Sequence, residues 1–219
     1  VANAYLGQAY HTLGQYGRAI DLARKNIASL EGDRINERFG MALLPSVYSR
    51  SLLVWSLAEI GEFAEGITIA EEGLRIAEAV NHPYSLVFAH IGIGRIHLRK
   101  GDVDQAVAML ERGLRLCQRA EVPVLFSMVA APLGSAYVLA GRVADGLSLL
   151  EQAAEKATAM GFTVVRSLMT TGLGEANLRA GRTEAALALA RNAVELSREL
   201  GARGSEAWAR RQLGEALSQ

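Results

Sequence analysis

Few residues in this chain combine the types and the spacing that catalysis or metal binding requires. His90 and His97 are seven residues apart, so they share one face of a helix and could offer two imidazoles to a metal ion. No third ligand is spaced to join them, and both fall at interior positions of the repeat described below. We therefore expect core histidines held by hydrogen bonds, and no metal site. Ser135 has no histidine or acid at a spacing that would activate its hydroxyl as a nucleophile.

The nucleotide-binding motifs are also incomplete. The segment Gly92–His97 begins like a dinucleotide-binding fingerprint, but the third glycine and a preceding strand are missing, and no glycine-rich loop ends in Gly-Lys-Ser/Thr. An acidic group is expected to form a solvated surface and not a catalytic pair; its members are Glu62, Glu65, Glu71 and Glu72. The sequence thus predicts no enzyme and no cofactor.

Glycines that recur at a fixed interval define the elements that carry these side chains. Gly101, Gly141 and Gly181 are 40 residues apart and each occupies a short turn, as do Gly14 and Gly61 upstream. A second glycine series precedes most of these turns by seven residues: Gly7, Gly94, Gly134, Gly174 and Gly214. Glycine inside a helix costs roughly 1 kcal/mol relative to alanine, so this series indicates close helix crossings. The pattern predicts an all-α fold, a right-handed superhelical solenoid of antiparallel helical hairpins.

The spacing predicts five hairpins and a terminal helix in one solenoid domain over residues 1–219. The repeats are expected at about 1–30, 47–80, 87–120, 127–160 and 167–200, with a capping helix at 205–217. Their first helices are expected at 3–13, 48–60, 88–100, 128–140 and 168–180, and their second helices at 16–30, 63–80, 104–120, 144–160 and 184–200. Because Val1 already lies in repeat phase, we expect a fragment of a larger protein.

One connection is longer than the others. Gly14 and Gly61 are 47 residues apart, so seven extra residues fall within Glu31–Ser46. Long loops in compact domains are often functional or mobile, but we favour the interpretation of this segment as a plain spacer.

The charge, the hydropathy and the cysteine content of the chain bear on which partners and which compartment we expect. Lys+Arg and Asp+Glu both number 23, so no overall basic field attracts nucleic acid or anionic lipid, and we expect neither as a partner. No apolar run approaches the ~18 residues of a membrane span. The single cysteine, Cys117, is expected to be a buried structural thiol, which suits a reducing, cytoplasmic setting.

The units resemble the tetratricopeptide repeat. The pair Leu6-Gly7 with Tyr10, followed by Gly14, matches its pattern, as does Leu133-Gly134 with Tyr137. Further matches are Tyr16, Ala19, Gly61, Phe63, Gly66, Gly101, Ala106 and Gly141. Departures are Val54 for the helix glycine, His97 and Asn177 for the tyrosine, and a period of 40 where about 34 is usual.

A narrower resemblance covers the second and third units. Arg38-Phe39-Gly40, Leu44–Val47, Ile76–Ala79 and His82–Ser85 look like the C-terminal repeats of large bacterial regulators. Such regulators join a cyclase or DNA-binding output domain to an ATPase. Those parts would lie outside this chain.

The family resemblance implies that the first helices line a concave groove, which we take as the candidate partner-binding site. Its residues are Tyr48, Ser51, Trp55, Phe88, Ile91, Arg95, Arg99, Met128, Ser135, Val138, Leu168, Thr171 and Glu175, with Trp208 on the last helix. Aromatic and methionine side chains with a few charges suit a peptide or a partner helix. Arg95 and Arg99 are expected to bind carboxylates of the partner.

Two functions remain open at this point. The first is a non-catalytic interaction module of a bacterial signalling protein, which binds a peptide, a partner helix or another domain of its own chain. The second is a sensor that binds a small molecule and controls an attached output domain. A sensor needs converging polar groups, whereas the polar residues here are dispersed. The oligomeric state is not predicted.

Overall fold

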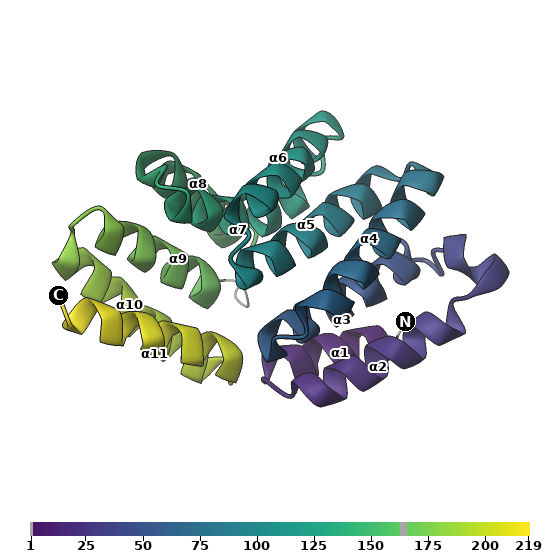
Figure 1. Cartoon of the computed structure of the whole chain (residues 1–219), viewed down its shortest axis with the longest axis horizontal. Coiled ribbons are helices and arrows are strands. Elements are labelled where there is room, and N and C mark those ends of the chain that lie inside the picture. Colours follow the sequence, from purple (N-terminus) through teal and green to yellow (C-terminus); the bar gives the residue numbers. More distant parts are fainter. Residues whose placement is uncertain (1, 163–165) are drawn as a thin grey trace. The chain divides into compact units, whose positions relative to one another are not determined.

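A computed structural model describes residues 2–162 and 166–219, and this part of the chain is helical with no strand (Figure 1). Its elements, in chain order, are α1 (Ala2–Thr12), α2 (Tyr16–Ser29), the 3₁₀ helix η1 (Gly32–Asn36), α3 (Pro45–Ile60), α4 (Phe63–Val80), α5 (Pro83–Lys100), α6 (Val103–Arg119), the 3₁₀ helix η2 (Pro123–Leu125), α7 (Phe126–Leu139), α8 (Val143–Ala159), α9 (Arg166–Arg179), α10 (Thr183–Glu199) and α11 (Arg203–Leu217). The predicted all-α repeat class is confirmed.

The turn glycines end the first helices because they adopt a left-handed backbone. Gly61 and Gly101 have φ of 85° and 91°, and the other three turn glycines, Gly14, Gly141 and Gly181, also have positive φ. Only glycine takes this conformation without steric cost, and the amide of such a residue closes the helix end. The amide of Gly101, for example, donates to the carbonyl oxygen of His97 at 3.0 Å.

Two first helices begin three or more residues earlier than predicted. α3 starts at Pro45 and α5 at Pro83, three and five residues before the expected starts at Tyr48 and Phe88. The prolines suggest breaks in the sequence, but a proline at the first helical position loses no intrahelical hydrogen bond and has a suitable φ. His82 also caps α5, since its Nδ1 accepts a hydrogen bond from the backbone amide of Ser85.

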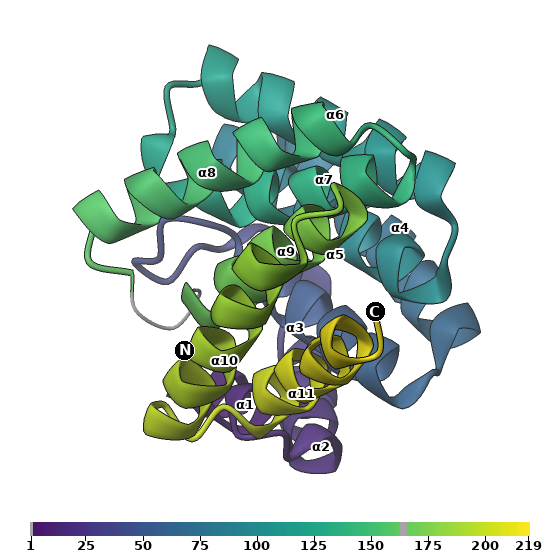
Figure 2. The same ribbon diagram turned by 90° about the vertical axis from the view of Figure 1, so that its left-hand side faces the viewer.

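Contact between elements divides the chain into two compact units. Unit 1 comprises residues up to His11 together with Gln15–Leu125, and unit 2 comprises Thr12–Gly14 and Phe126–Gln219. Within unit 1, α3 packs against α2, α4 and α5, and α5 packs against α6. Within unit 2, α7 packs against α8 and α9, and α9, α10 and α11 pack against one another (Figure 2). The single-domain expectation stays a prediction.

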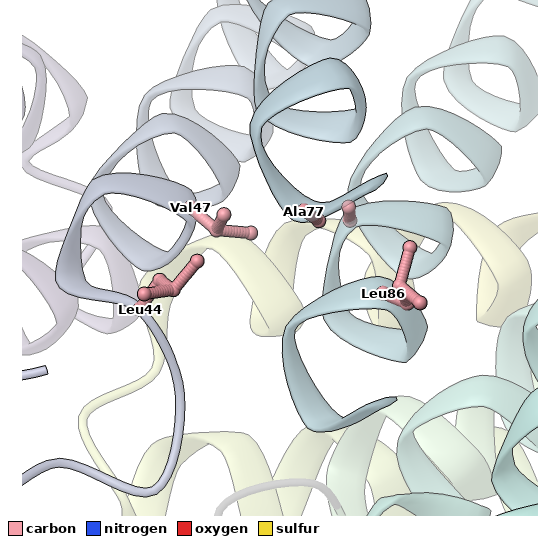
Figure 3. Close-up of a cluster of buried hydrophobic side chains, with 5 residues drawn as sticks. Leu44, Val47, Ala77 and Leu86 are labelled. Atoms are coloured by element: carbon pink, nitrogen blue, oxygen red, sulfur yellow. The ribbon is translucent and has the colours of Figure 1, made fainter. Parts of the chain in front are cut away.

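The long connection in unit 1 is anchored at its second half. Met41, Leu43 and Leu44 are buried, and the amide of Leu44 donates to Ser85 Oγ at 2.9 Å. Leu44 and Val47 join Ala77 of α4 and Leu86 of α5 in one apolar cluster (Figure 3). The tip is different, because Phe39 is 48% exposed with a φ of 47°. Whether the tip is a spacer or a contact for a partner stays open.

The second glycine series marks close crossings at four of its five positions. A Cβ added at Gly7, Gly94, Gly134 or Gly174 would lie within 3.0 Å of a side chain in a neighbouring helix. Gly214 was expected to behave in the same way, but it is exposed and has nothing within 4 Å. None of the described helices packs on that face of α11, so the fifth position is not a crossing.

Candidate protein-interaction site

Aromatic rings from α1, α3 and α5 form a continuous series in unit 1, which we call the aromatic cluster. Its members are Tyr5 and His11 of α1, Tyr48 and Trp55 of α3, and Phe88 of α5. Ring centroids are 6.3 Å apart for Tyr5 and Tyr48, 5.5 Å for Tyr48 and Phe88, 5.4 Å for Phe88 and Trp55, and 6.3 Å for Trp55 and His11. These separations are typical of attractive tilted ring pairs.

The repeat register brings these side chains together. Tyr48 and Phe88 are 40 residues apart, and so are Trp55 and Arg95. Residues at equivalent positions of successive hairpins lie on neighbouring first helices, and α3 packs directly on α5. Three of the predicted partner-binding residues of α3 and α5 therefore meet in the cluster, and a fourth, Arg95, lies on it.

Arg95 stacks on the indole ring of Trp55. Its guanidinium carbon lies 4.5 Å from the ring centroid, within the range of a cation–π contact. Trp55 is 6% exposed and Phe88 4% exposed, whereas Arg95 is half-buried and Tyr5 is exposed. In this conformation a partner would touch Arg95 and Tyr5, and the buried rings support them from beneath.

The sequence predicts that Arg99 binds a carboxylate of the partner, but in the structure Arg99 pairs with a carboxylate of this chain. Its Nε donates to Glu59 Oε1 of α3 at 3.0 Å, and the side chain of Glu59 is only 10% exposed. These two residues also stand 40 apart in sequence. Arg99 is thus engaged within the fold, whereas no ion pair or side-chain hydrogen bond of Arg95 is found among the described residues.

Burial shifts the protonation equilibria at the cluster. It lowers the pKa of Arg95 to about 10, and the neighbouring Arg99 adds to the effect. It also lowers the pKa of His11 to about 4, with Arg95 as the next cause, so His11 is neutral at pH 7. His11 Nδ1 lies 3.0 Å from Ser56 Oγ. Burial raises the pKa of Tyr48 to about 12, and its hydroxyl donates to Gln8 Oε1 at 2.5 Å.

The remaining predicted residues of unit 1 have packing contacts. Ser51 is buried against α5, where a Cβ added at Gly92 would lie 3.2 Å from its hydroxyl oxygen. Ile91 is 1% exposed. Neither presents surface to a partner in this conformation.

The predicted residues of unit 2 are described separately. Val138 is buried, Ser135 of α7 lies against Gly172 of α9, and Glu175 pairs with Arg179 at 3.4 Å. Thr171 Oγ1 donates to the carbonyl oxygen of Ser167 in its own helix. The half-buried residues are Met128, Ser135, Leu168, Thr171 and Glu175. No aromatic cluster comparable to that of unit 1 is formed by this set.

Sequence reasoning missed the residues of α1. Gln8, which bonds Tyr48, follows Gly7 as Arg95 follows Gly94, so the same register could have identified it. Tyr5 and His11 occupy no marked position of the repeat. Only the structure brings them to Tyr48 and Trp55.

The residues considered for chemistry pack or pair within the fold. His97 is 3.3 Å from Asp102, as expected for a hydrogen-bonded core histidine. For His90 the expectation of a hydrogen bond is wrong, because its buried Nδ1 has no partner among the described residues. Glu72 is not merely a solvated acid, because it pairs with the buried Arg50 at 2.9 Å. Cys117 is buried as predicted, and its thiol donates to the carbonyl oxygen of Val122.

The described residues also lack two features that would point to other functions. They contain no group of three or more histidine, cysteine, aspartate or glutamate side chains that could hold a metal ion. None of the described helices has the length and apolar character needed to cross a membrane.

Comparisons with known proteins identify the repeat. Family models described as tetratricopeptide repeat match residues 89–123 and 170–192. A search of the curated proteins found no match. These matches identify tetratricopeptide repeats within the two segments, and the similar structures below share the helical-repeat fold over nearly the whole chain.

Solved structures share the fold over nearly the whole chain. A Rap protein complexed with competence and sporulation factor superposes with a TM-score of 0.63 at 13% identity, over 97% of this chain and 61% of that protein. A thermophilic tetratricopeptide protein of Thermus thermophilus gives 0.64 at 18% identity, over 100% and 98%. A signal transduction ATPase with numerous domains from Pyrococcus horikoshii, which has a tetratricopeptide repeat sensor, gives 0.64 at 16%, over 98% of this chain and 32% of that protein.

At these identities the likeness shows the fold alone. This chain spans less than two thirds of the Rap protein and about a third of the ATPase. From the fold we conclude that this chain is a helical-repeat module, and such modules generally serve protein interaction.

Proposed function

We propose that this chain is a non-catalytic interaction module that binds a peptide or a partner helix across α1, α3 and α5 of unit 1. In this proposal it is a regulatory part of a bacterial signalling protein and acts in the cytoplasm. The Rap protein whose fold it shares was solved in complex with competence and sporulation factor, and the similar ATPase has a tetratricopeptide repeat sensor. Both examples support a regulatory role for such an array.

One observation carries the proposal. Arg95 lies half-buried on Trp55 at 4.5 Å, and the buried rings of Phe88 and Tyr48 connect this contact to the exposed Tyr5. Arginine, tryptophan and tyrosine are the residues that most often dominate interface energies. Since the buried rings support one another, they hold Arg95 and Tyr5 rigidly, which lowers the entropic cost of binding a partner.

A test begins with the purified chain and a displayed library of random peptides. Removal of a central interface side chain typically costs ~2 kcal/mol or more, which is about thirtyfold in affinity. We expect Arg95→Ala and Trp55→Ala each to weaken the selected peptides by about this factor. Arg142→Ala is the matched control, because Arg142 lies over Tyr137 in unit 2 in a similar arginine–aromatic contact, 3.8 Å from the centroid.

Trp55 is also a core residue, so each variant needs a helicity and melting measurement beside the binding measurement. Arg95→Ala removes a half-buried side chain and should keep the fold. If the library yields no binder, or if both variants bind selected peptides as the wild type does, the proposal is wrong.

The alternative is a ligand-sensing domain that controls an attached ATPase, cyclase or DNA-binding output domain. The tetratricopeptide repeat sensor of the similar ATPase favours it. Mass spectrometry of the purified chain under native conditions separates the two functions, because a sensor should retain or bind a small molecule where an interaction module does not.

A further inference from the structure

Arg95 is a cation without an anion. Neighbouring arginines show the usual arrangement, since Arg99 pairs with Glu59 at 3.0 Å and the buried Arg50 pairs with Glu72 at 2.9 Å. For Arg95 the described residues provide the face of Trp55 and no carboxylate within ion-pair distance. Glu59 acts on Arg95 only through space, because its bonded partner is Arg99.

The position is unfavourable in the free chain. Burial withdraws the guanidinium from water, and Arg99 adds like-charge repulsion. A desolvated charge without a partner costs free energy, which proteins usually offset with an ion pair. Trp55 adds a second unsatisfied donor, because its buried indole N–H has no acceptor among the described residues. The guanidinium of Arg95 thus lacks an acceptor, and so does the indole N–H of the ring on which it lies.

The local charge indicates what kind of acceptor fits. Arg95 and Arg99 contribute two positive charges and Glu59 one negative charge, while His11 is neutral, so the site carries a net charge of +1. A carboxylate carries one negative charge and two acceptor oxygens, and it forms forked pairs with arginine. A phosphate ester carries roughly −1.5 to −2 and would leave the site overcompensated.

The ring contacts that start at Trp55 end in accessible aromatic side chains in both directions, the exposed Tyr5 at one end and the half-buried His11 and Tyr16 at the other. From Trp55 the ring contacts run to Phe88 and Tyr48 in one direction, and to His11 and Tyr16 in the other. A bound segment can thus extend past Arg95 in both directions, which suits a side chain within the segment better than a chain terminus.

We propose that the segment bound by unit 1 is an acidic peptide in which the carboxylate of one internal aspartate or glutamate pairs with Arg95 above Trp55. This inference rests on the proposed function and names the chemistry of its partner. Arg99 has no direct part in the recognition, because it holds Glu59.

The test uses the full chain and a random library of peptides with amidated C-termini. Selected peptides should share one acidic position, and changing that residue from Glu to Gln should weaken binding by about tenfold, the effect of losing one charge-assisted pair. Arg95→Glu should reverse the preference at that position to lysine or arginine. Arg24→Glu, a charge reversal on the outer helix α2 where Arg24 pairs with Glu65, should leave the selection unchanged.

A second measurement does not depend on any peptide. Arg95→Met keeps an extended side chain over Trp55 and removes the unpaired charge, so its melting temperature should equal or exceed that of the wild type. A lower melting temperature would mean that the guanidinium stabilises the free fold, and the inference would be overturned.

The outcomes separate the two proposals. If the library yields no binder, the proposed function fails and the inference fails with it. If binders appear and depend on Trp55 but share no acidic position, or bind Arg95→Met unchanged, only the carboxylate inference fails. If binding requires a free C-terminal carboxylate in place of an internal acid, the assignment to an internal side chain is overturned.

Discussion

His90 illustrates how a single buried residue can link stability to pH. Its ring is 6% exposed on α5 and its Nδ1 has no hydrogen-bond partner among the described residues. Burial lowers its pKa to about 4, and Arg112 and Arg115 of α6 contribute in the same direction. The folded chain thus holds His90 as a neutral imidazole.

We expect the chain to lose stability as the pH falls from 6.5 to about 4. In this window the unfolded chain binds a proton at the histidine and the folded chain does not, so protonation favours unfolding. His11 contributes with the same sign, because its pKa is also lowered to about 4. Urea midpoints across this range should fall less steeply for His90→Gln than for the wild type. Equal slopes for the two proteins would show that His90 does not titrate in this way.

Arg95, Trp55 and the pair Glu59–Arg99 show how much of the candidate site the sequence could predict. The 40-residue period places Arg95 at the position of Trp55 one hairpin later, and Arg99 at the position of Glu59, so both contacts follow from the register. The repeat period cannot predict how deeply the ring of Trp55 is buried. The burial of Trp55 depends on His11 and Phe88, which come from two other helices.

At the scale of the element, small residues set how closely the two helices of a hairpin approach. In unit 2 the helices α7 and α8 cross at two glycines. A Cβ added at Gly146 would lie 2.7 Å from the carbonyl oxygen of Gly134 and 3.1 Å from the amide nitrogen of Val138. Since both are backbone atoms, neither can move without shifting a helix. Gly174 is crowded by the side chain of Gln212, which is flexible but buried.

We expect Gly146→Ala and Gly174→Leu each to destabilise the chain by roughly 1–3 kcal/mol, as overpacking of a close crossing does. Gly214→Ala is the matched control, because Gly214 has nothing within 4 Å. There alanine should be neutral or stabilise by up to ~1 kcal/mol through its helix propensity. Denaturant unfolding of the three variants measures these changes. If Gly146→Ala has the same unfolding stability as the wild type, α7 and α8 do not approach as closely as described.

The sequence predicted the number and order of the main helices well, because glycine marks both their ends and their crossings. A turn with positive φ and a close helix crossing both favour glycine because of the backbone geometry. The glycines can therefore be recognised in the sequence even where the other side chains vary. The starts of α3 and α5 were predicted less well, because a proline signals both a break and a helix start.

At the scale of the whole molecule, one repeat position carries different chemistry along the chain. The residue after the close-packed site is Gln8, Trp55 and Arg95 in unit 1, but Ser135 and Glu175 in unit 2. Ser135 packs on Gly172 and Glu175 is paired with Arg179. The scaffold is thus repeated while the side chain at this position changes, which is consistent with the proposal that a partner binds unit 1.

Unit 2 depends on α11 to cover its apolar side. Ala216 packs with Leu178 and Ala186 in one cluster, and Ala209 packs with Ala193 and Val194 in another. The opposite side of α11 is polar, with the exposed residues Arg203, Arg210, Arg211 and Glu215. The helix is thus apolar toward the repeats and charged on its other side, which suits the predicted capping role; that role stays a prediction.

Deletion of residues 203–219 should expose these two clusters and make the chain aggregate, because contiguous apolar surface promotes association. The deletion also removes Glu206, whose carboxylate pairs with Arg198 of α10 at 3.0 Å, so the end of α10 should fray. Light scattering and size-exclusion chromatography measure the aggregation. Removal of Ser218 and Gln219 alone is the control, since both are exposed and follow the end of α11. A 203–219 deletion that stays monomeric and melts at the temperature of the control would show that α11 does not protect the repeats before it.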